Sequence, residues 1–334
     1  MIRILPAAGS VSRGPNFGSD VPVIGIVNNM PDAALLATEH QFCDLLTEVS
    51  QNFLICLRFF SMPQLPRSEA GRAFVKRYEE IGELLAADRL DALIVTGTEV
   101  HAPLLQDEPY WTTLTKVVDW AKDHTTSTIW SCLGAHAAVL HLDGIQRRPF
   151  REKLSGVFEC YKVADHAIVS DAPARWCVPH SRYNSLPEEE LVSRGYRVLS
   201  RSPEVGADLF LRQGRSLFVF LQGHPEYDSP ALFREYRRDI REFVAGARNS
   251  YPTMPCGYFD EKTAAEFDEL RDRILRDRSA DTVLKFPDCE TTLPHSWHEQ
   301  AVRLYTNWLS YVVEHKQSGN GLKESHSANA SHAG

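Results

Sequence analysis

The 334-residue chain lacks the sequence features of several large protein classes. No apolar run approaches the roughly 20 residues of a membrane-spanning helix, and the first residues, Met1–Pro6, have too few apolar side chains for a signal peptide. No basic run of useful length is present, and the net charge of −8 argues against an electrostatic grip on nucleic acid. We therefore expect a cytoplasmic protein that acts on small molecules, with no nucleic-acid or membrane partner.

Cysteine pairs at metal-binding or disulfide-forming spacings are also missing. The seven cysteines are an odd number at irregular spacings, and no two of them form a Cys-x-x-Cys pair. This pattern predicts neither a zinc site nor a disulfide framework, and it fits a reducing compartment. We expect no bound metal ion.

A regular alternation of apolar strands and helices is present in the first half of the chain. Strands are predicted at residues 21–27, 53–60, 90–97 and 127–130, and helices at 33–49, 71–87, 111–122 and directly after Cys132. This order predicts an α/β fold with a doubly wound, mostly parallel sheet. Ligands of such sheets gather at the carboxyl ends of the strands, where segments 28–31 and 97–101, Cys132 and His224 all fall.

After residue 144 the pattern changes to shorter strands, which predict a mixed or antiparallel extension of the sheet. They are expected at residues 156–163, 196–200, 207–212 and 216–221, and helices follow at 230–247, 261–277 and 295–315. We expect an N-terminal segment at 1–20, one domain at 21–316 whose C-terminal helical part begins near residue 230, and a disordered tail at 317–334, which is rich in Ser, Gly, Asn and His.

Cys132 stands where a strand is predicted to stop and a helix to start. Residues 127–130 form an apolar strand, and alanines and leucines follow the cysteine. The free N–H groups and the positive dipole end of a helix stabilise a thiolate at such a corner. A free cysteine beside a strand is nevertheless more often inert packing, so the corner alone does not assign a nucleophile.

A histidine and an acid follow the last predicted strand. Residues 217–221 run directly into His224 and Glu226, and residues two apart on an extended segment point to the same side. The acid can then orient the imidazole while the imidazole faces a thiol. Because one mechanism needs both this corner and that of Cys132, we predict a Cys132–His224–Glu226 triad.

With these motifs in place, the chain resembles the homoserine O-acyltransferases of methionine biosynthesis. This family comprises homoserine O-succinyltransferases and O-acetyltransferases with a class I glutamine amidotransferase-like fold. Besides the Cys132 corner, the resemblance includes segments Asp91–Gly97, Pro109–Trp111, Glu152–Val157, Pro179–Tyr183, Gly223–Asp228 and Thr306–Leu309. It covers most of the chain and implies an acyltransferase that needs no bound cofactor and takes acyl-CoA as co-substrate.

The resemblance also implies roles for individual residues. Cys132 matches the acyl-thioester nucleophile, His224 the general base and Glu226 its acidic partner, in a ping-pong mechanism. The family's positions for gripping the amino-acid substrate match Lys153, Ser181 and Arg238. Taken alone, Lys153 and Arg238 also fit solvated surface positions, and Ser181 fits a turn in a loop.

The oxyanions of this mechanism need hydrogen-bond donors. We expect them to be the backbone N–H of Leu133, at the start of the helix, and those of Thr98 and Glu99, in the loop after Gly97.

His101 aligns with the loop position that sorts acyl donors in the family, which is commonly Gly or Glu. A larger side chain there shortens the acyl pocket, so we expect acetyl-CoA to be preferred over succinyl-CoA. Segment Met30–Leu36 lacks the lysines usual at that place, which leaves serine or another hydroxy amino acid open as the acceptor.

A class I glutaminase uses the same triad and remains an alternative, although Trp130 stands where such enzymes usually carry a glycine. A catalytically silent binding protein is a further alternative. A homodimer is our expectation for the assembly.

Overall fold

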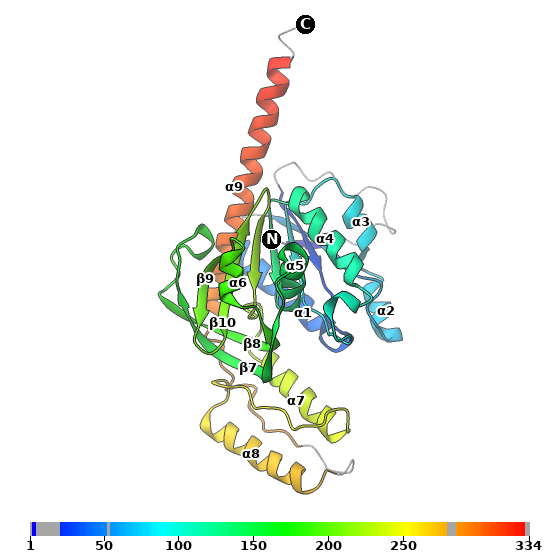
Figure 1. Cartoon of the computed structure of the whole chain (residues 1–334), viewed down its shortest axis with the longest axis vertical. Helices are drawn as coiled ribbons and strands as arrows, with labels where there is room; N and C mark the ends of the chain where they lie inside the picture. Colours follow the sequence, from blue (N-terminus) through cyan, green and yellow to red (C-terminus); the bar gives the residue numbers. More distant parts are fainter. Residues whose placement is uncertain (1, 5–20, 52–53, 279–284, 331–334) are drawn as a thin grey trace.

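The computed structural model describes residues 2–4, 21–51, 54–278 and 285–330, and side chains are described for 21–51, 54–278 and 285–316. Within these ranges, eleven strands form one sheet (Figure 1). The strands are β1 Ile2–Ile4, β2 Val23–Val27, β3 Ile55–Ser61, β4 Glu79–Glu80, β5 Ala92–Val95, β6 Ser127–Ser131, β7 Arg148–Lys162, β8 Arg175–Ser185, β9 Arg197–Ser202, β10 Gly206–Gln213 and β11 Leu217–Leu221.

The sheet has a parallel half and an antiparallel half. Its strand order is β1-β3-β2-β5-β6-β11-β10-β9-β7-β8, with β4 paired to β3. Pairs from β1 to β11 are parallel, and pairs from β11 to β8 are antiparallel. Leu221 of β11 pairs with Ser131 of β6, so the chain leaves both strands at the same point of the sheet edge. This pairing brings the segments after residues 131 and 221 together.

Helices cover both faces of the sheet, in agreement with the predicted doubly wound architecture. The helices are α1 Asp32–Val49, α2 Glu69–Val75, α3 Ile81–Ala86, α4 Trp111–His124, α5 Leu133–Asp143, α6 Glu188–Ser193, α7 Ala231–Val244, α8 Glu261–Arg276 and α9 His298–Ala330, with 3-10 turns η1 Leu105–Asp107 and η2 Ala167–Val169. Side chains of α3, α4 and α5 share one apolar core with every second strand residue, such as Leu93 and Val95. Those of α1 and α9 share the other with Ala92 and Ile94. The alternation follows from the period of two in a strand.

The helix predicted at residues 71–87 is instead split into α2, β4 and α3. Glu79 of the short strand β4 is buried and forms an ion pair with Arg58 of β3. A strand-to-strand pairing therefore overrides the helical propensity of this segment. Strand β8 was also not predicted, because Pro179 and the polar residues after it have the composition of a loop.

The C-terminal helical part has a small core of its own. Helices α7 and α8 lie together beyond β7 and β8 in Figure 1, and they share a cluster that includes Phe233, Tyr236 and Phe267. Helix α9 continues to Ala330, although the helix was expected to end near residue 315 and a disordered tail to begin at 317. No proline interrupts this stretch, so the backbone helix continues. Most of segment 1–20 and residues 331–334 lie outside the described residues.

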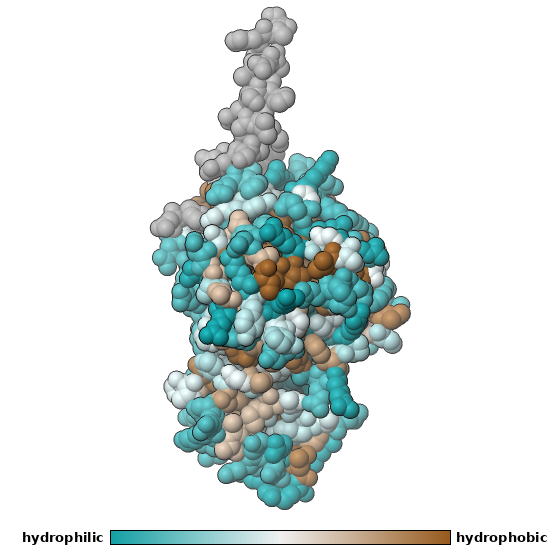
Figure 2. Space-filling model, turned by 60° about the vertical axis from the view of Figure 1, so that its left-hand side comes forward, coloured by the Kyte–Doolittle hydropathy of each residue, from teal (hydrophilic) through white to brown (hydrophobic). Residues whose placement is uncertain are grey.

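Figure 2 shows one face of the molecule, which is mainly hydrophilic and on which hydrophobic residues gather in separate patches among polar ones. The exposed large hydrophobic residues come from different elements and are Leu36, Leu104, Tyr161, Val163, Tyr183, Val192 and Leu275. Among the described residues, no helix combines the length and apolar character needed to cross a membrane.

Candidate active site

Cys132 occupies a strained corner between β6 and α5. Its φ of 49° and ψ of −113° lie in a region that side chains other than glycine rarely adopt. The corner is held from both sides: the Cys132 N–H donates to the Leu221 carbonyl at 2.7 Å, and the Cys132 carbonyl accepts from the His136 N–H at 3.2 Å. The thiol side chain is partly exposed. This is the geometry of a nucleophile presented on a strand-to-helix turn.

Two glycines allow the loop after β5 to pack against this corner. A Cβ at Gly134 would lie 2.9 Å from the Val95 carbonyl oxygen, and one at Gly97 would lie 3.3 Å from the Leu133 nitrogen. Leu133 is the first residue of α5, so its N–H has no acceptor in its own helix. Gly97 therefore brings the loop that continues into Thr98 and Glu99 next to the start of α5. The use of the Leu133, Thr98 and Glu99 N–H groups as oxyanion donors stays a prediction.

His224 and Glu226 lie beside Cys132, at the end of β11. The His224 Nδ1 is 2.9 Å from Glu226 Oε1, and the two residues are only 6% and 7% exposed. Burial lowers the pKa of His224, but the negative charges of Cys132 and Glu226 and hydrogen bonds to both outweigh it, so the pKa lies well above its usual value. The arrangement favours a protonated His224 imidazole beside the Cys132 sulfur.

Glu226 has further neighbours that sequence patterns did not reveal. Ser131 Oγ donates to Glu226 Oε1 at 3.2 Å. Glu226 Oε2 is buried without a hydrogen-bond partner in the described structure, and so is the hydroxyl of Tyr305 on α9. Burial and then the charge of Glu226 raise the pKa of Tyr305. Ser131 and Tyr305 are both distant from Glu226 in sequence, so no local motif indicates these contacts.

Tyr227 connects the triad to helix α7. Its ring stacks on the His224 imidazole with 4.2 Å between ring centroids. Its hydroxyl donates to Glu235 Oε1 at 2.6 Å, and its carbonyl accepts from Trp297 Nε1 at 2.7 Å. The tyrosine is therefore fixed at both ends between the base and Glu235.

The three predicted substrate-binding residues meet around Glu235. Ser181 Oγ and Lys153 Nζ both donate to Glu235 Oε2, the lysine at 3.0 Å. Lys153 also donates to Asp239 at 3.0 Å, and Arg238 binds the other oxygen of Asp239 through Nε at 3.1 Å and Nη2 at 2.8 Å. Burial raises the pKa of Glu235, but the charge of Lys153 and the hydrogen bonds from Ser181 and Tyr227 bring it down to about 2.

This cluster differs from the simple surface interpretation of its members. The Lys153 side chain is 10% exposed, Ser181 lies in strand β8, and Arg238 is only partly exposed. Sequence analysis missed Glu235, although it stands three residues before Arg238 and therefore on the same side of α7. That spacing is the signal that identifies it.

His101 lies on the loop after β5 with its side chain 59% exposed. Glu108 fixes the loop by accepting the N–H groups of His101 and Ala102 at 2.5 and 2.7 Å, and the imidazole lies 4.0 Å from the Glu99 carboxylate. These bonds hold the backbone and leave the imidazole largely in solvent, and the role of His101 in the choice of acyl donor stays a prediction.

The overall architecture is that of the class I glutamine amidotransferases. A glutamine amidotransferase from Thermotoga maritima has a TM-score of 0.50 and 14% identity, covering 88% of this chain and 99% of its own. One from Methylobacillus flagellatus has the same TM-score and identity, covering 87% of this chain and 95% of its own. At this identity the likeness shows the fold alone.

The chain belongs to the homoserine O-succinyltransferase family, whose model matches residues 21–318. It is 48% identical to the homoserine O-succinyltransferase of Rhodopseudomonas palustris, over 89% of this chain and 90% of the relative. Identity to that of Methylorubrum extorquens is 46%, over 87% of each chain. The protein is therefore an acyltransferase. These relatives are named for the succinyl donor, in contrast to the acetyl preference expected from His101.

Proposed function

We propose that the protein is a succinyl-CoA:L-homoserine O-succinyltransferase of methionine biosynthesis, with Cys132 as the nucleophile. One observation carries this proposal: an unbroken series of contacts from the His224 imidazole through Tyr227 to Glu235, around which Lys153 and Ser181 gather. The group that moves protons is thus joined directly to a set of charges suited to an amino acid.

The first half-reaction loads the acyl group onto Cys132. His224 holds the proton of the thiol, and the thiolate attacks the thioester carbonyl of succinyl-CoA. The oxyanion that forms accepts hydrogen bonds from the N–H of Leu133 and from the loop at Thr98 and Glu99. As the tetrahedral intermediate collapses, the carbon–sulfur bond to CoA breaks, and His224 returns the proton to the departing CoA thiolate.

The second half-reaction transfers the succinyl group to the acceptor hydroxyl. His224 removes the hydroxyl proton, the alkoxide attacks the Cys132 thioester, and the Cys132 thiolate leaves. Glu235 is ionised and receives the α-ammonium group, and Arg238 pairs with the α-carboxylate. Lys153 and Arg238 together offset the charges of Glu235 and Asp239, so the site stays close to neutral when the zwitterionic amino acid binds.

Arg147 is our candidate for binding the free carboxylate of the succinyl group. It is half-buried, and in the described part of the chain it makes no hydrogen bond or ion pair, whereas the next residue, Arg148, pairs with Glu189 and Glu190. Burial lowers the pKa of Arg147, and the groups that oppose this shift are Tyr110, Glu108 and Cys132. An arginine that senses the charges of Glu108 and Cys132 and makes no ion pair among the described residues favours a diacid over an acetyl group.

A substrate matrix tests the proposed function. Succinyl-CoA and acetyl-CoA are combined with homoserine and with serine, and release of free CoA thiol is followed. We expect turnover with succinyl-CoA and homoserine, and a succinyl group on Cys132 by mass spectrometry when succinyl-CoA is given alone. Faster turnover with acetyl-CoA or serine contradicts the donor or the acceptor, and ammonia release from glutamine favours a glutaminase.

The role of Arg147 has a matched control next to it. Arg147→Gln should lower kcat/KM for succinyl-CoA by about 10- to 100-fold, because a charge-assisted hydrogen bond contributes about 1.5–3 kcal/mol, and should leave use of acetyl-CoA nearly unchanged. Arg148→Gln, which removes the exposed ion pairs with Glu189 and Glu190, should change the use of neither acyl donor. Equal losses for both donors would remove Arg147 from donor selection.

A further inference from the structure

A second histidine and carboxylate lie buried behind the catalytic loop. His180 of β8 and Asp208 of β10 have side chains that are almost completely buried, and His180 Nε2 is 3.4 Å from Asp208 Oδ1. Neither residue belongs to the proposed mechanism. Asp208 is held further by Ser200 Oγ, which donates to Oδ2 at 2.8 Å.

Arg182 determines which nitrogen of His180 carries the proton. Its Nε donates to His180 Nδ1 at 3.3 Å, so Nδ1 is the acceptor and the proton of the neutral imidazole lies on Nε2, facing Asp208. Burial, followed by the charge of Arg182, holds the pKa of His180 well below its usual value. The result is a buried series of contacts from Arg182 through His180 to Asp208, in which His180 Nε2 lies 3.4 Å from Asp208 Oδ1 without a hydrogen bond between them.

The same place also has the composition of a metal site, but the protonation argues against one. Ligand atoms of Cys160, His180 and Asp208 all lie within 4.8 Å of one another. A metal ion would need the lone pair of His180 Nε2, which carries the proton while Arg182 occupies Nδ1. The adjacent guanidinium also repels a cation. Asp208 and the imidazole are therefore better described as close polar neighbours than as metal ligands.

One end of this chain holds the backbone of the catalytic loop. The Gly223 N–H donates to Asp208 Oδ1 at 3.3 Å, and the His224 N–H donates to the carbonyl of Pro179, the residue before His180, at 2.8 Å. A Cβ at Gly223 would lie 2.9 Å from both Asp208 Oδ1 and His180 Cε1. His224 is thus anchored on either side of the His180–Asp208 pair.

The other end reaches the corner of Cys132. Arg182 Nη1 donates to Gln222 Oε1 at 3.4 Å, and the same oxygen lies 2.9 Å from His136 Nε2. The His136 N–H in turn donates to the Cys132 carbonyl. The chain therefore contacts the backbone of Gly223, next to the base, and reaches the backbone of the nucleophile through Gln222 and His136.

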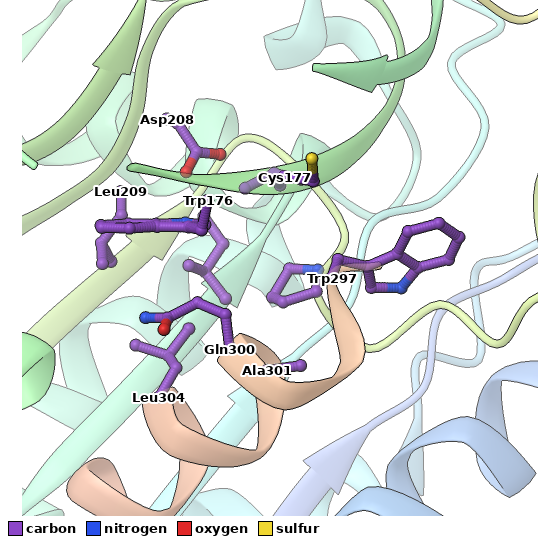
Figure 3. A pocket seen from close by; sticks show the side chains of 11 residues that line it. Trp176, Cys177, Asp208, Leu209, Trp297, Gln300, Ala301 and Leu304 are labelled. Carbon is purple, nitrogen blue, oxygen red and sulfur yellow. The ribbon is translucent and has the colours of Figure 1, made fainter. Parts of the chain in front are cut away.

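Asp208 also borders a small cavity with a mainly apolar lining. The cavity measures about 20 Å³, room for about one water molecule. Figure 3 shows it between Trp176 and Cys177 of β8, Leu209 of β10 and the first turns of α9. With so little water available, the carboxylate depends on its protein partners.

We propose that the chain Asp208–His180–Arg182 positions His224 against Cys132 for the acyl-transfer reaction. This proposal rests on the proposed function for the identity of the reaction. The alignment of the His224 imidazole with the Cys132 thiol, however, does not depend on which substrate is used. His180 acts here as a neutral connector between two buried charges and touches neither substrate. Its loss shifts the base relative to the thiol, and a misplacement of about 1 Å costs on the order of 100-fold in rate.

Two substitutions of His180 separate positioning from packing. His180→Gln keeps an acceptor for Arg182 and a donor for Asp208, whereas His180→Leu removes both. We expect kcat to fall about 10- to 100-fold in His180→Leu with little change in the KM for homoserine, and His180→Gln to recover most of it. Cys160→Ala, in the same buried cluster but outside the chain, should keep wild-type activity.

Alkylation of Cys132 by iodoacetamide across pH provides a readout that needs no substrate. His180→Leu should shift the pH midpoint of alkylation upward, because a displaced imidazolium stabilises the thiolate less. If the Leu variant does not fold, Asp208→Asn gives the same test and should also shift the midpoint. An unshifted midpoint in a folded variant overturns the proposal. A kcat in His180→Gln as low as that in His180→Leu also overturns it.

Metal analysis of the purified protein completes the test. We expect no stoichiometric metal. If the wild type contains one zinc per chain and Cys160→Ala contains none, the cluster is a metal site and the positioning role is wrong. Absence of succinyl transfer in the wild type would contradict the proposed function, while the alkylation comparison would still decide the role of His180.

Discussion

Two buried histidine–carboxylate pairs lie on opposite sides of Gly223 and differ in the charge of the histidine. In the pair His224–Glu226 the pKa of the imidazole is raised well above its usual value, and in His180–Asp208 it is lowered well below it. Burial acts in the same direction in both. The charged neighbours differ: Cys132 and Glu226 raise the pKa of His224, whereas Arg182 and His224 lower that of His180 further. A carboxylate partner alone therefore does not make a histidine a base.

Cys132→Ala tests this explanation most severely and has the largest expected effect. Acyl transfer should be abolished, because no other group holds the thioester. Without the thiolate the pKa of His224 should fall toward that of a buried neutral histidine, while His180 stays neutral, as NMR titration of the two imidazoles can show. Cys256→Ala, at an exposed cysteine, serves as the control. Normal turnover in Cys132→Ala would eliminate the assigned nucleophile.

Glu226→Gln weakens the other partner of the catalytic pair. Turnover should fall by about 10- to 1000-fold, because an orienting acid supports the proton transfer without performing it. The loss of negative charge should also lower the pKa of His224 and move the pH profile of kcat with it. Activity equal to that of the wild type, with an unchanged profile, would show that the charge on His224 depends on Cys132 alone.

Arg238→Ala extends the comparison to the acceptor site. The KM for homoserine should rise by about 10- to 100-fold, since a hydrogen-bonded charge pair contributes about 1.5–3 kcal/mol, and the KM for succinyl-CoA should stay nearly constant. Arg234→Ala is the matched control, because this arginine lies on the same helix in an exposed pair with Asp228. An effect confined to the KM for succinyl-CoA would reassign Arg238 to the donor.

Glu235 offers a third carboxylate, which is partly buried, and the smallest expected effect. Its folded pKa of about 2 lies below the ordinary value of 4.5, so the unfolded chain binds more protons between these values. The stability that this group contributes is present above about pH 4.5 and is lost as the pH falls toward 2. Acid unfolding should be less steep over this range in Glu235→Gln. An identical acid dependence in the variant would show that other carboxylates control it.

The parallel half of the sheet and the Cys132 corner were accessible from sequence because their signals are local. A buried strand, a cysteine and a run of helix formers are consecutive residues, and periodicity reports them directly. The fold class and family follow from such segments. Glu235 was also within reach through its spacing from Arg238 on α7.

The antiparallel half was less predictable because its structure depends on distant partners. Strand β8 contains Pro179 and polar residues, and it becomes a strand by pairing with β7. Glu79 was predicted to lie in a helix, but it belongs to strand β4 and forms an ion pair with Arg58. His180, Arg182 and Asp208 come from two strands and gain their protonation states from one another, which no local pattern encodes.

The pairing of β6 with β11 has a consequence for how the protein is made. Ser131 and Glu226 are separated by 95 residues, and all of β7 to β10 emerges from the ribosome between them. Until β11 inserts beside β6, the nascent chain carries Cys132 without the histidine that activates it. The thiol therefore lacks its proposed catalytic histidine through most of synthesis, and reactivity appears only when β11 has paired with β6.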